Sequence, residues 1–462
     1  MNTQLWQLDA TDLAQKIRAG QASAREATEA CLARLHAVNP RLNAVVRLMD
    51  DEALKAADDA DRRQSAGKPL PPLHGVPVTI KVNVDQVGHP TDNGVVAFKD
   101  AIATEDNPVV ASFRNAGAII IGRTNVPAFS MRAFSDNALH GRTLNPRDPT
   151  ISAGGSSGGA GSAVASGIGP IGHGNDIAGS VRIPAMFNGI VGLRVSLGRV
   201  ASFNPSLKAA RPLAAQLMSV QGPLTRTIRD ARLALQVMAA PDPRDTRWVA
   251  TPMRGEPLPR RVALVPGNPG GTIHPAQAEA VRTAGRHLAA AGYLVEEIDP
   301  PSMTEAINDF FTILSTDVLA ALAPQMHELG DENAKKSMDL WLDLMPPSDM
   351  AAVLGAYARR DWYLHQWLIF MQAYPLVILP TMGGLAPEHD LDTTRDGQID
   401  MMNRMRVAQL SPMLGLPALA VPVGHAGTLR PSVQIMAPRF REDLCLDAGE
   451  VIEAAEGVIT PI

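Results

Sequence analysis

The spacing of apolar residues predicts two helices near the start of the chain. Apolar side chains recur three and four residues apart over residues 11–38, which is the period of a helix with one buried face. Thr11 or Asp12 is expected to cap the first helix, and Ser23 the second. A third, highly charged helix is expected at 51–64, on the surface of the protein.

Apolar runs between the helices predict strands. Residues 72–85, PLHGVPVTIKVNVD, alternate and are rich in β-branched side chains, as strands are. Residues 107–124 predict a helix, a turn at Gly117 and a buried strand. A strand–helix–strand unit is expected over 260–299. Further strands are expected at 375–381 and 416–424. Helices that alternate with apolar strands predict the α/β fold class.

The chain shows neither a repeat of fixed period nor a clear linker. We therefore expect a single domain over residues 1–462. Residues 303–373 are predicted to be mostly helical and carry 8 of the 19 aromatic residues. The segment 255–370 is expected to be a variable, mostly helical elaboration that faces the substrate.

The composition of the chain favours a soluble enzyme over a nucleic-acid-binding or membrane protein. The 462 residues carry a net charge of −5, 45% are hydrophobic and 19% are charged, which is ordinary for a soluble enzyme. No long block of like charge favours a nucleic acid or a membrane as a partner. The first 20 residues do not resemble a secretory signal, and no apolar run of about 20 residues predicts a membrane-spanning helix. A cytoplasmic location is expected.

The two cysteines do not indicate a redox or metal site. Cys31 and Cys445 cannot form a disulfide framework and lack the spacing of metal ligands. We expect small buried thiols and no metal.

Residues 152–167, SAGGSSGGAGSAVASG, match simple glycine motifs that fail in their context. Residues 155–159 fit the G-x-S-x-G nucleophile elbow, which would make Ser157 the nucleophile, but a proline-punctuated loop precedes them instead of a strand. Residues 167–172 fit G-x-G-x-x-G, but a proline interrupts the motif. The only Gly-Lys pair, at 67–68, is followed by proline, which excludes a phosphate-binding loop.

A longer set of motifs is far more specific. NPRDPTISAGGSSGGAGSAVASG at 145–167 is followed by IGHGNDIAGSVRIPAMFNGIVGLRVSLGRVA at 171–201, and together they resemble the amidase signature family of amide hydrolases. The resemblance extends over most of the first 240 residues and the last 90 or so, and is weak over 245–370. It implies a large mixed β-sheet core surrounded by helices.

The resemblance also implies a catalytic triad. Its nucleophile is Ser180, its proton relay is Ser156, preceded by a cis peptide bond, and its general base is Lys81. The family's usual spacing separates the two serines.

The chemistry of amide hydrolysis agrees with a lysine base. A serine hydroxyl needs a neighbour that accepts its proton, and the 11 histidines form no obvious Ser–His–Asp arrangement. Lysine can accept a proton only when it is neutral, and burial beside Val78, Ile80 and Val82 would lower its pKa. Arginine could not replace it, because arginine does not lose its proton in proteins. Only 8 of the 42 basic residues are lysines, so a lysine within a strand stands out.

Residues around Ser180 are expected to stabilise the oxyanion. VRIPAMFNG predicts a short helix that opens at the serine, so the backbone N–H groups of Ile177, Ala178, Gly179 and Ser180 would point into one concavity. Many family members have glycine at the position of Ala178, where a positive φ would strain the methyl group. Other departures from the family pattern are Val82, Ala128 and Asn175, the last of which replaces a threonine.

Several nearby residues have structural interpretations. Ser157 and Ser162 are expected to pack a close helix, and His74 and His173 to be structural. Asp176 is expected to pair with Arg182 or with loop amides. Met131 and Phe134 either line a substrate pocket or belong to the core.

We therefore predict an amidohydrolase that forms an acyl-enzyme on Ser180 and releases ammonia or an amine. Its partner is a small-molecule amide, with no metal or organic cofactor, and esterase activity is expected at the same site. Two alternatives stay open: the glutaminase subunit of a tRNA-dependent amidotransferase, and a catalytically silent binding protein. Trp341, Trp362 and Trp367 hint at an apolar or aryl acyl group, although such residues also form cores. Base rates favour a homodimer.

Overall fold

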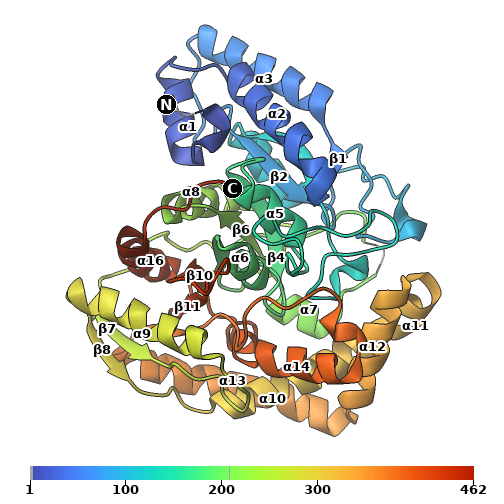
Figure 1. Cartoon of the computed structure of the whole chain (residues 1–462), viewed down its shortest axis with the longest axis vertical. Helices are drawn as coiled ribbons and strands as arrows, with labels where there is room; N and C mark the ends of the chain where they lie inside the picture. The colour runs from blue at the N-terminus through green and yellow to red at the C-terminus, as the bar shows by residue number, and fades with distance from the viewer. Residues whose placement is uncertain (1–3, 208) are drawn as a thin grey trace.

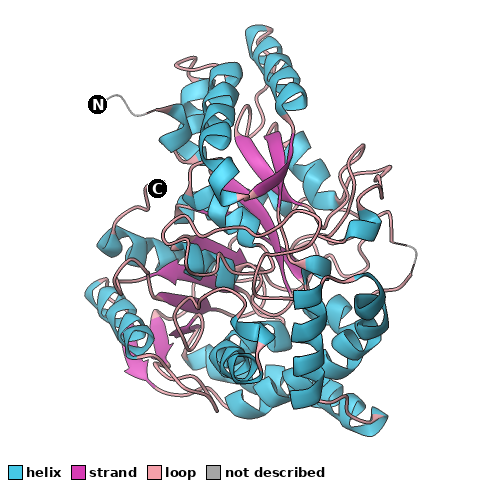
Figure 2. Ribbon diagram, turned by 45° about the vertical axis from the view of Figure 1, so that its right-hand side comes forward, coloured by secondary structure: helices cyan, strands magenta, loops and turns pink. Residues whose placement is uncertain are grey.

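One mixed sheet of 11 strands runs through the molecule, and helices cover it (Figures 1 and 2). The computed structural model describes residues 4–207 and 209–462. The strand order is β1-β3-β2-β4-β6-β5-β10-β11-β9-β7-β8. The strands are β1 (Val45–Leu48), β2 (Pro77–Lys81), β3 (Ile119–Thr124), β4 (Ile171–Asp176), β5 (Val191–Arg194), β6 (Val220–Thr225), β7 (Arg261–Leu264), β8 (Leu294–Glu297), β9 (Leu376–Pro380), β10 (Ala418–Pro422) and β11 (Ser432–Met436). This architecture confirms the predicted α/β class and the large mixed sheet surrounded by helices.

The helices alternate with the strands along most of the chain. They are α1 (Ala10–Arg18), α2 (Ala24–Leu42), α3 (Asp50–Ser65), α4 (Pro108–Asn115), α5 (Gly158–Ala165), α6 (Arg182–Asn188), α7 (Leu213–Met218), α8 (Ile228–Met238), α9 (Pro275–Ala290), α10 (Met303–Ile313), α11 (Ala320–Leu329), α12 (Glu332–Leu344), α13 (Met350–Ala373), α14 (Arg395–Met405), α15 (Leu410–Leu414) and α16 (Glu442–Glu456). Short 3-10 or π segments are η1 (Leu5–Gln7), η2 (Val96–Phe98), η3 (Ala128–Ser130), η4 (Leu314–Leu319), η5 (Leu391–Thr393) and η6 (Arg406–Gln409).

Two parallel groups of strands are joined by antiparallel pairs. Strand β2 runs parallel to β3 and β4, and β7 runs parallel to β8 and β9. Between these groups, β10 pairs antiparallel with β5, with Ala418 opposite Arg194. This pairing connects the first half of the chain to its C-terminal part.

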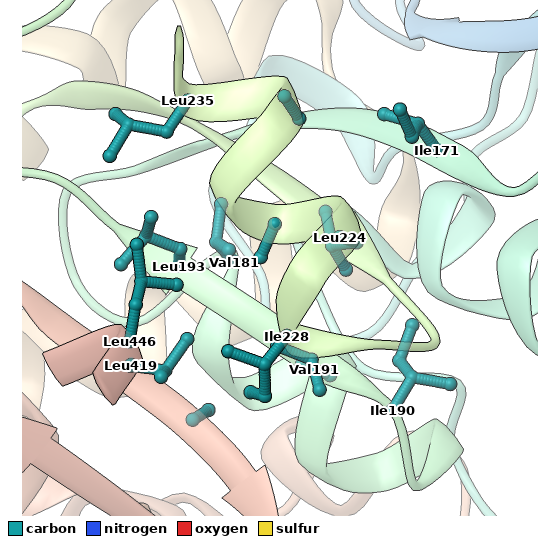
Figure 3. Close-up of a cluster of buried hydrophobic side chains, with 14 of the residues drawn as sticks. Ile171, Val181, Ile190, Val191, Leu193, Leu224, Ile228, Leu235, Leu419 and Leu446 are labelled. Atoms are coloured by element: carbon teal, nitrogen blue, oxygen red, sulfur yellow. The ribbon is translucent and has the colours of Figure 1, made fainter. Parts of the chain in front are cut away.

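Apolar side chains from distant segments fill the centre. Figure 3 shows side chains of one buried cluster, which includes Ile171, Leu193 and Leu224 from three strands, Ile228 of α8 and Leu446 of α16. Val181 lies in the same buried cluster. Because Val181 directly follows Ser180, the core holds one end of the segment that carries the predicted nucleophile.

The two N-terminal helices form as predicted, but the first has a different cap. Asp9 caps α1, accepting a hydrogen bond from the backbone N–H of Asp12, so the expected cap at Thr11 or Asp12 is wrong by two or three positions. Ser23 caps α2 as expected, and Glu26 completes a capping box. Gly117 forms the expected turn between α4 and β3, with φ at +78°.

The segment 255–370 is an integral part of the sheet. It contributes β7 and β8 at one edge, in addition to helices α9–α13. In Figure 1 these elements lie on the lower side of the molecule, away from α1–α3. The segment is thus mostly helical, as predicted, but its strands extend the common sheet.

Across the residues that the structure describes, one helical run has the length and composition of a membrane-spanning helix. The most apolar 18-residue window of this run, Met303–Leu329, has a mean hydropathy of 1.4, and 56% of that window is buried inside the protein. The sequence predicts no such segment, because no apolar run approaches about 20 residues. Core helices of folded domains share these properties.

Candidate active site

Lys81 is the last residue of β2 and is completely buried. Its neighbours Val78, Ile80 and Val82 are buried with it. Burial lowers the pKa of Lys81 well below its ordinary value, and the negative charge of Asp176 opposes this shift only in part. Compared with an exposed lysine, this shift favours the neutral amine, the form that can accept a proton.

The amine of Lys81 has two hydrogen-bond partners. Its Nζ lies 2.8 Å from Ser156 Oγ and 2.7 Å from Asn175 Oδ1. An amide oxygen can only accept, so Lys81 must donate an N–H group to Asn175. The lone pair of a neutral amine is then available for the hydroxyl proton of Ser156.

Ser156 lies in a tight turn at the start of α5. The peptide bond between Gly155 and Ser156 is cis, as the resemblance implies. A Cβ atom at Gly155 would lie 2.4 Å from the carbonyl oxygen of Arg132, so only glycine fits there. The glycines in this stretch allow the close approach of chain segments that the turn requires.

Ser180 lies in the loop between β4 and α6, and Asp176 anchors this loop. The carboxylate of Asp176 accepts hydrogen bonds from the backbone N–H groups of Gly179 at 2.9 Å and Val181 at 3.2 Å. It also forms buried ion pairs with Arg182 and Arg194. Burial opposes the charge of Asp176, but the two arginines and the Gly179 N–H hold the pKa of its carboxyl group well below the usual range. Asp176 and Arg182 are therefore paired, as expected.

The sharp bend of this loop falls on glycine. Gly179 has φ at +103°, whereas Ala178 is not among the residues with positive φ. The methyl group of Ala178 is therefore compatible with the loop, and the strain considered from the sequence does not arise.

The backbone donors near Ser180 differ in availability. The N–H of Gly179 is bound to Asp176 Oδ1, so this predicted oxyanion donor is already occupied. Within the described part of the chain, the N–H groups of Ile177, Ala178 and Ser180 make no protein hydrogen bond. These three remain as candidate oxyanion donors.

Ser156 and Ser180 face one cavity. The backbone N–H of Ser157 donates to the carbonyl oxygen of Ser180 at 3.3 Å, which joins the two loops. Both serines line an open cavity with about 1600 Å³ of unfilled space, part of it open to solvent. Among the described residues, no hydrogen bond is formed by Ser180 Oγ, so the half-buried hydroxyl is free to meet a ligand.

Sequence reasoning missed a network of amides behind the lysine. Asn175 Nδ2 donates to Asn83 Oδ1 at 2.9 Å, and Asn83 Nδ2 donates to Ser130 Oγ at 3.0 Å and to Asn175 Oδ1 at 3.2 Å. Ser130 Oγ in turn donates to Asn93 Oδ1 at 2.6 Å. The sequence holds one signal for this network, which is that Asn175 occupies a position where the family commonly has threonine.

The other singled-out polar residues have structural surroundings. His173 is buried between Gln221 Oε1, 2.8 Å from its Nε2, and the backbone of Lys81. Burial lowers the pKa of His173 to about 3, with a smaller contribution from Lys81, so the ring stays neutral. Ser162 donates to the carbonyl oxygen of Leu144, and the hydroxyl of Ser157 has no partner among the described residues. His74 is buried, and burial lowers its pKa.

A second cavity also reaches Ser180. It has about 690 Å³ of unfilled space, which includes its opening to solvent. Met131 and Phe134, the predicted pocket residues, both line it. Helices α12 and α14 contribute Trp341, Met401 and Met405. We call this largely apolar space the inner cavity.

Comparisons with known proteins agree on one family. The family model described as amidase matches residues 26–446. The chain is 45% identical to indoleacetamide hydrolase of Bradyrhizobium diazoefficiens, over 98% of this chain and 88% of the relative. It is 33% identical to an acylamidase of Rhodococcus erythropolis, over 97% and 95%. The solved structure of 6-aminohexanoate cyclic dimer hydrolase with its substrate matches with a TM-score of 0.83 at 28% identity, over 99% of this chain and 98% of that one.

Proposed function

The chain belongs to the amidase signature family, and from this premise we propose that it hydrolyses a carboxamide through an acyl-enzyme on Ser180, with Ser156 as proton relay and Lys81 as general base. Amide hydrolysis as such follows from the family and its relatives. The observation that carries the mechanism is the 2.8 Å contact between Ser156 Oγ and the buried, neutral-favouring amine of Lys81.

Acylation uses the three residues in sequence. Ser180 Oγ attacks the carbonyl carbon of the amide and passes its proton to Ser156 Oγ, while Ser156 passes its own proton to Lys81 Nζ. The negative charge that develops on the carbonyl oxygen is met by the free backbone N–H groups of Ile177, Ala178 and Ser180.

Collapse of the tetrahedral intermediate breaks the C–N bond. The proton on Lys81 returns through Ser156 to the departing nitrogen, which leaves as ammonia or an amine. Water then attacks the ester on Ser180 with the same relay, giving the carboxylic acid and the free serine. An ester with the same acyl group would pass through the same intermediate, so esterase activity is expected as well.

We propose an arylacetic amide as the substrate. The inner cavity offers Phe134, Trp341, Met401 and Met405 to an acyl group, which suits a flat aromatic ring. The relative with 45% identity is an indoleacetamide hydrolase. Indole-3-acetamide and phenylacetamide are therefore the substrates to test first.

Trapping the acyl-enzyme tests the mechanism. The purified chain alone is mixed with phenylacetamide, quenched rapidly and digested, and mass spectrometry is expected to find the acyl group on the peptide that contains Ser180. Ser180→Ala should lose both the adduct and ammonia release, whereas Ser157→Ala, the matched control directly after the relay Ser156, should keep both. An adduct on Ser157, or turnover by Ser180→Ala, would contradict the assignment. Failure of the isolated chain to release ammonia from any amide would favour the subunit alternative.

A further inference from the structure

Two buried glutamines in the inner cavity carry an unpaired acceptor. Gln398 and Gln409 are 2% and 1% exposed, and both line the cavity that reaches Ser180. Among the described residues, the side-chain oxygen of each has no hydrogen-bond partner. Buried polar groups are nearly always paired, so two unpaired acceptors beside one cavity point to a donor that the described protein residues do not supply.

The orientation of Gln409 is fixed by its other end. Its Nε2 donates to the carbonyl oxygens of Met405 at 3.0 Å and Ala178 at 3.3 Å. Turning the amide over would place an oxygen against two oxygens. The oxygen of Gln409 is therefore the end left for another molecule.

Gln398 shares a helix face with apolar cavity residues. Gln398, Met401 and Met405 are three and four positions apart on α14 and all line the inner cavity. Neither end of the Gln398 carboxamide makes a hydrogen bond to a described residue, so it can turn its oxygen to a ligand. On this helix face, the thioethers of Met401 and Met405 can contact the flat side of an aromatic ring. The amide of Gln398 can bind a polar atom at the edge of the same ring.

The positive charge of Arg132 in the cavity is more than offset by its partners. Arg132 donates to both oxygens of Asp392, at 2.9 and 2.6 Å, and to Asp390 at 3.0 Å. Its Nη1 has no partner among the described residues, but two carboxylates offset its charge. The cavity therefore favours a neutral acyl group over one that carries a carboxylate.

From these contacts we propose that one of the two amide oxygens, that of Gln409 or that of Gln398, accepts a hydrogen bond from a ring N–H of the acyl group. The enzyme then selects arylacetamides with a ring donor, such as an indole, over rings of the same shape without one. This inference rests on the proposed function of the same cavity. It adds a glutamine oxygen as the acceptor for the ring N–H.

The experiment compares indole-3-acetamide with benzofuran-3-acetamide, in which oxygen replaces the ring N–H. The wild-type kcat/KM is expected to favour the indole by about tenfold or more, because the benzofuran leaves buried acceptors unpaired. In the double variant Gln398→Met/Gln409→Met the preference should fall to about threefold or less, and the single variants show which amide contributes more. Gln372→Met, at the exposed end of α13, is the matched control and should keep the wild-type preference.

The ratio of the two rates separates the outcomes. Equal rates in the wild type, or a double variant that keeps the preference, would overturn the proposal. Phenylacetamide has no ring donor and serves as the reference for folding and catalysis. If the wild type hydrolyses neither phenylacetamide nor the indole, the proposed function fails instead.

Discussion

At the scale of single residues, the chemistry depends on keeping one lysine neutral. The direct partners of the Lys81 amine are a hydroxyl and an amide, Ser156 and Asn175, neither of which carries a charge. The carboxylate that acts on Lys81, Asp176, is itself neutralised by Arg182 and Arg194. The site therefore stabilises an ammonium ion only weakly. A weakly stabilised ammonium favours the neutral amine that a general base requires.

Replacing Lys81 tests this directly. We expect Lys81→Arg and Lys81→Met each to lower kcat/KM by about 10²–10⁴-fold, because arginine stays charged and methionine cannot accept a proton. In the wild type, protonation of Lys81 removes the base, so kcat/KM should fall as the pH drops through the lysine pKa. Because that pKa is depressed, the acid limb should lie well below pH 10.4. A profile of kcat/KM against pH measures the limb, and an active Lys81→Arg variant would refute the role.

Asn175 is a positioning residue that acts through Lys81. The variant Asn175→Asp keeps the shape but places a carboxylate 2.7 Å from the amine, which should raise the lysine pKa and move the acid limb to higher pH by a unit or more. The pH profile of kcat/KM is the measurement. Asn308→Asp, an exposed change on α10, should leave the limb in place, and an unmoved limb in Asn175→Asp would contradict the argument.

At the scale of elements, three segments bring the site together: the end of β2, the turn before α5 and the loop between β4 and α6. The alternation in β2 made that strand predictable, and the motifs located both serines. Strand β4, IGHGND, was missed because glycines interrupt its pattern. A Cβ at Gly174 would lie 2.8 Å from Leu224 and from Ser157, so close packing demanded glycine where a strand pattern needs an apolar residue. Asn175 lies on this strand, which is why its contact with Lys81 could not be predicted from the sequence.

The loop between β4 and α6 should not tolerate a side chain at its bend. Gly179→Ala is expected to lower both kcat and the free energy of unfolding, because alanine disfavours a φ of +103° and its Cβ would lie 2.7 Å from Ile183. Gly88→Ala also has a positive φ, +81°, but an added Cβ meets nothing within 4 Å, so it should show only the backbone cost of about 1–2 kcal/mol. Denaturant unfolding and phenylacetamide turnover measure both variants. If both variants lost the same free energy of unfolding, close packing around Gly179 would not contribute to stability.

At the scale of the whole molecule, buried carboxyl groups join three distant parts of the chain. Asp230 on α8 accepts hydrogen bonds from the backbone N–H groups of Ala10 and Thr11 at the start of α1. Glu453 on α16 accepts one from the N–H of Ile228, at 2.8 Å. Burial raises the pKa of Asp230 to about 6 and that of Glu453 to about 7, so both carboxyl groups hold protons more tightly in the folded protein than in the unfolded one.

This shift predicts a pH dependence of stability. A carboxyl group with a raised pKa stabilises the fold fully only below its unfolded pKa near 4.5, and the contribution is lost as the pH rises through about 7. Glu453→Gln keeps an acceptor for Ile228 but cannot ionise. Relative to the wild type, its free energy of unfolding should improve by about 1–3 kcal/mol between pH 5 and pH 8. Urea unfolding at both pH values measures this, with the exposed Glu305→Gln as control, and parallel wild-type and variant curves would exclude the effect.

The order of strands in the sheet separates the segments that carry the triad from the later helices that line the inner cavity. Lys81, Ser156 and Ser180 come from segments before residue 181, at and around β2 and β4, whereas Trp341 and the α14 residues of the inner cavity come from the later chain beyond β7 and β8. The two portions meet where β5 pairs with β10. Changes in the later helices would therefore alter one side of the inner cavity, while Met131, Phe134 and the bond-breaking residues stay with the early segments. Related enzymes with the same triad segments can thus differ in substrate through their later helices. Chimaeras of such enzymes are best joined where β5 pairs with β10.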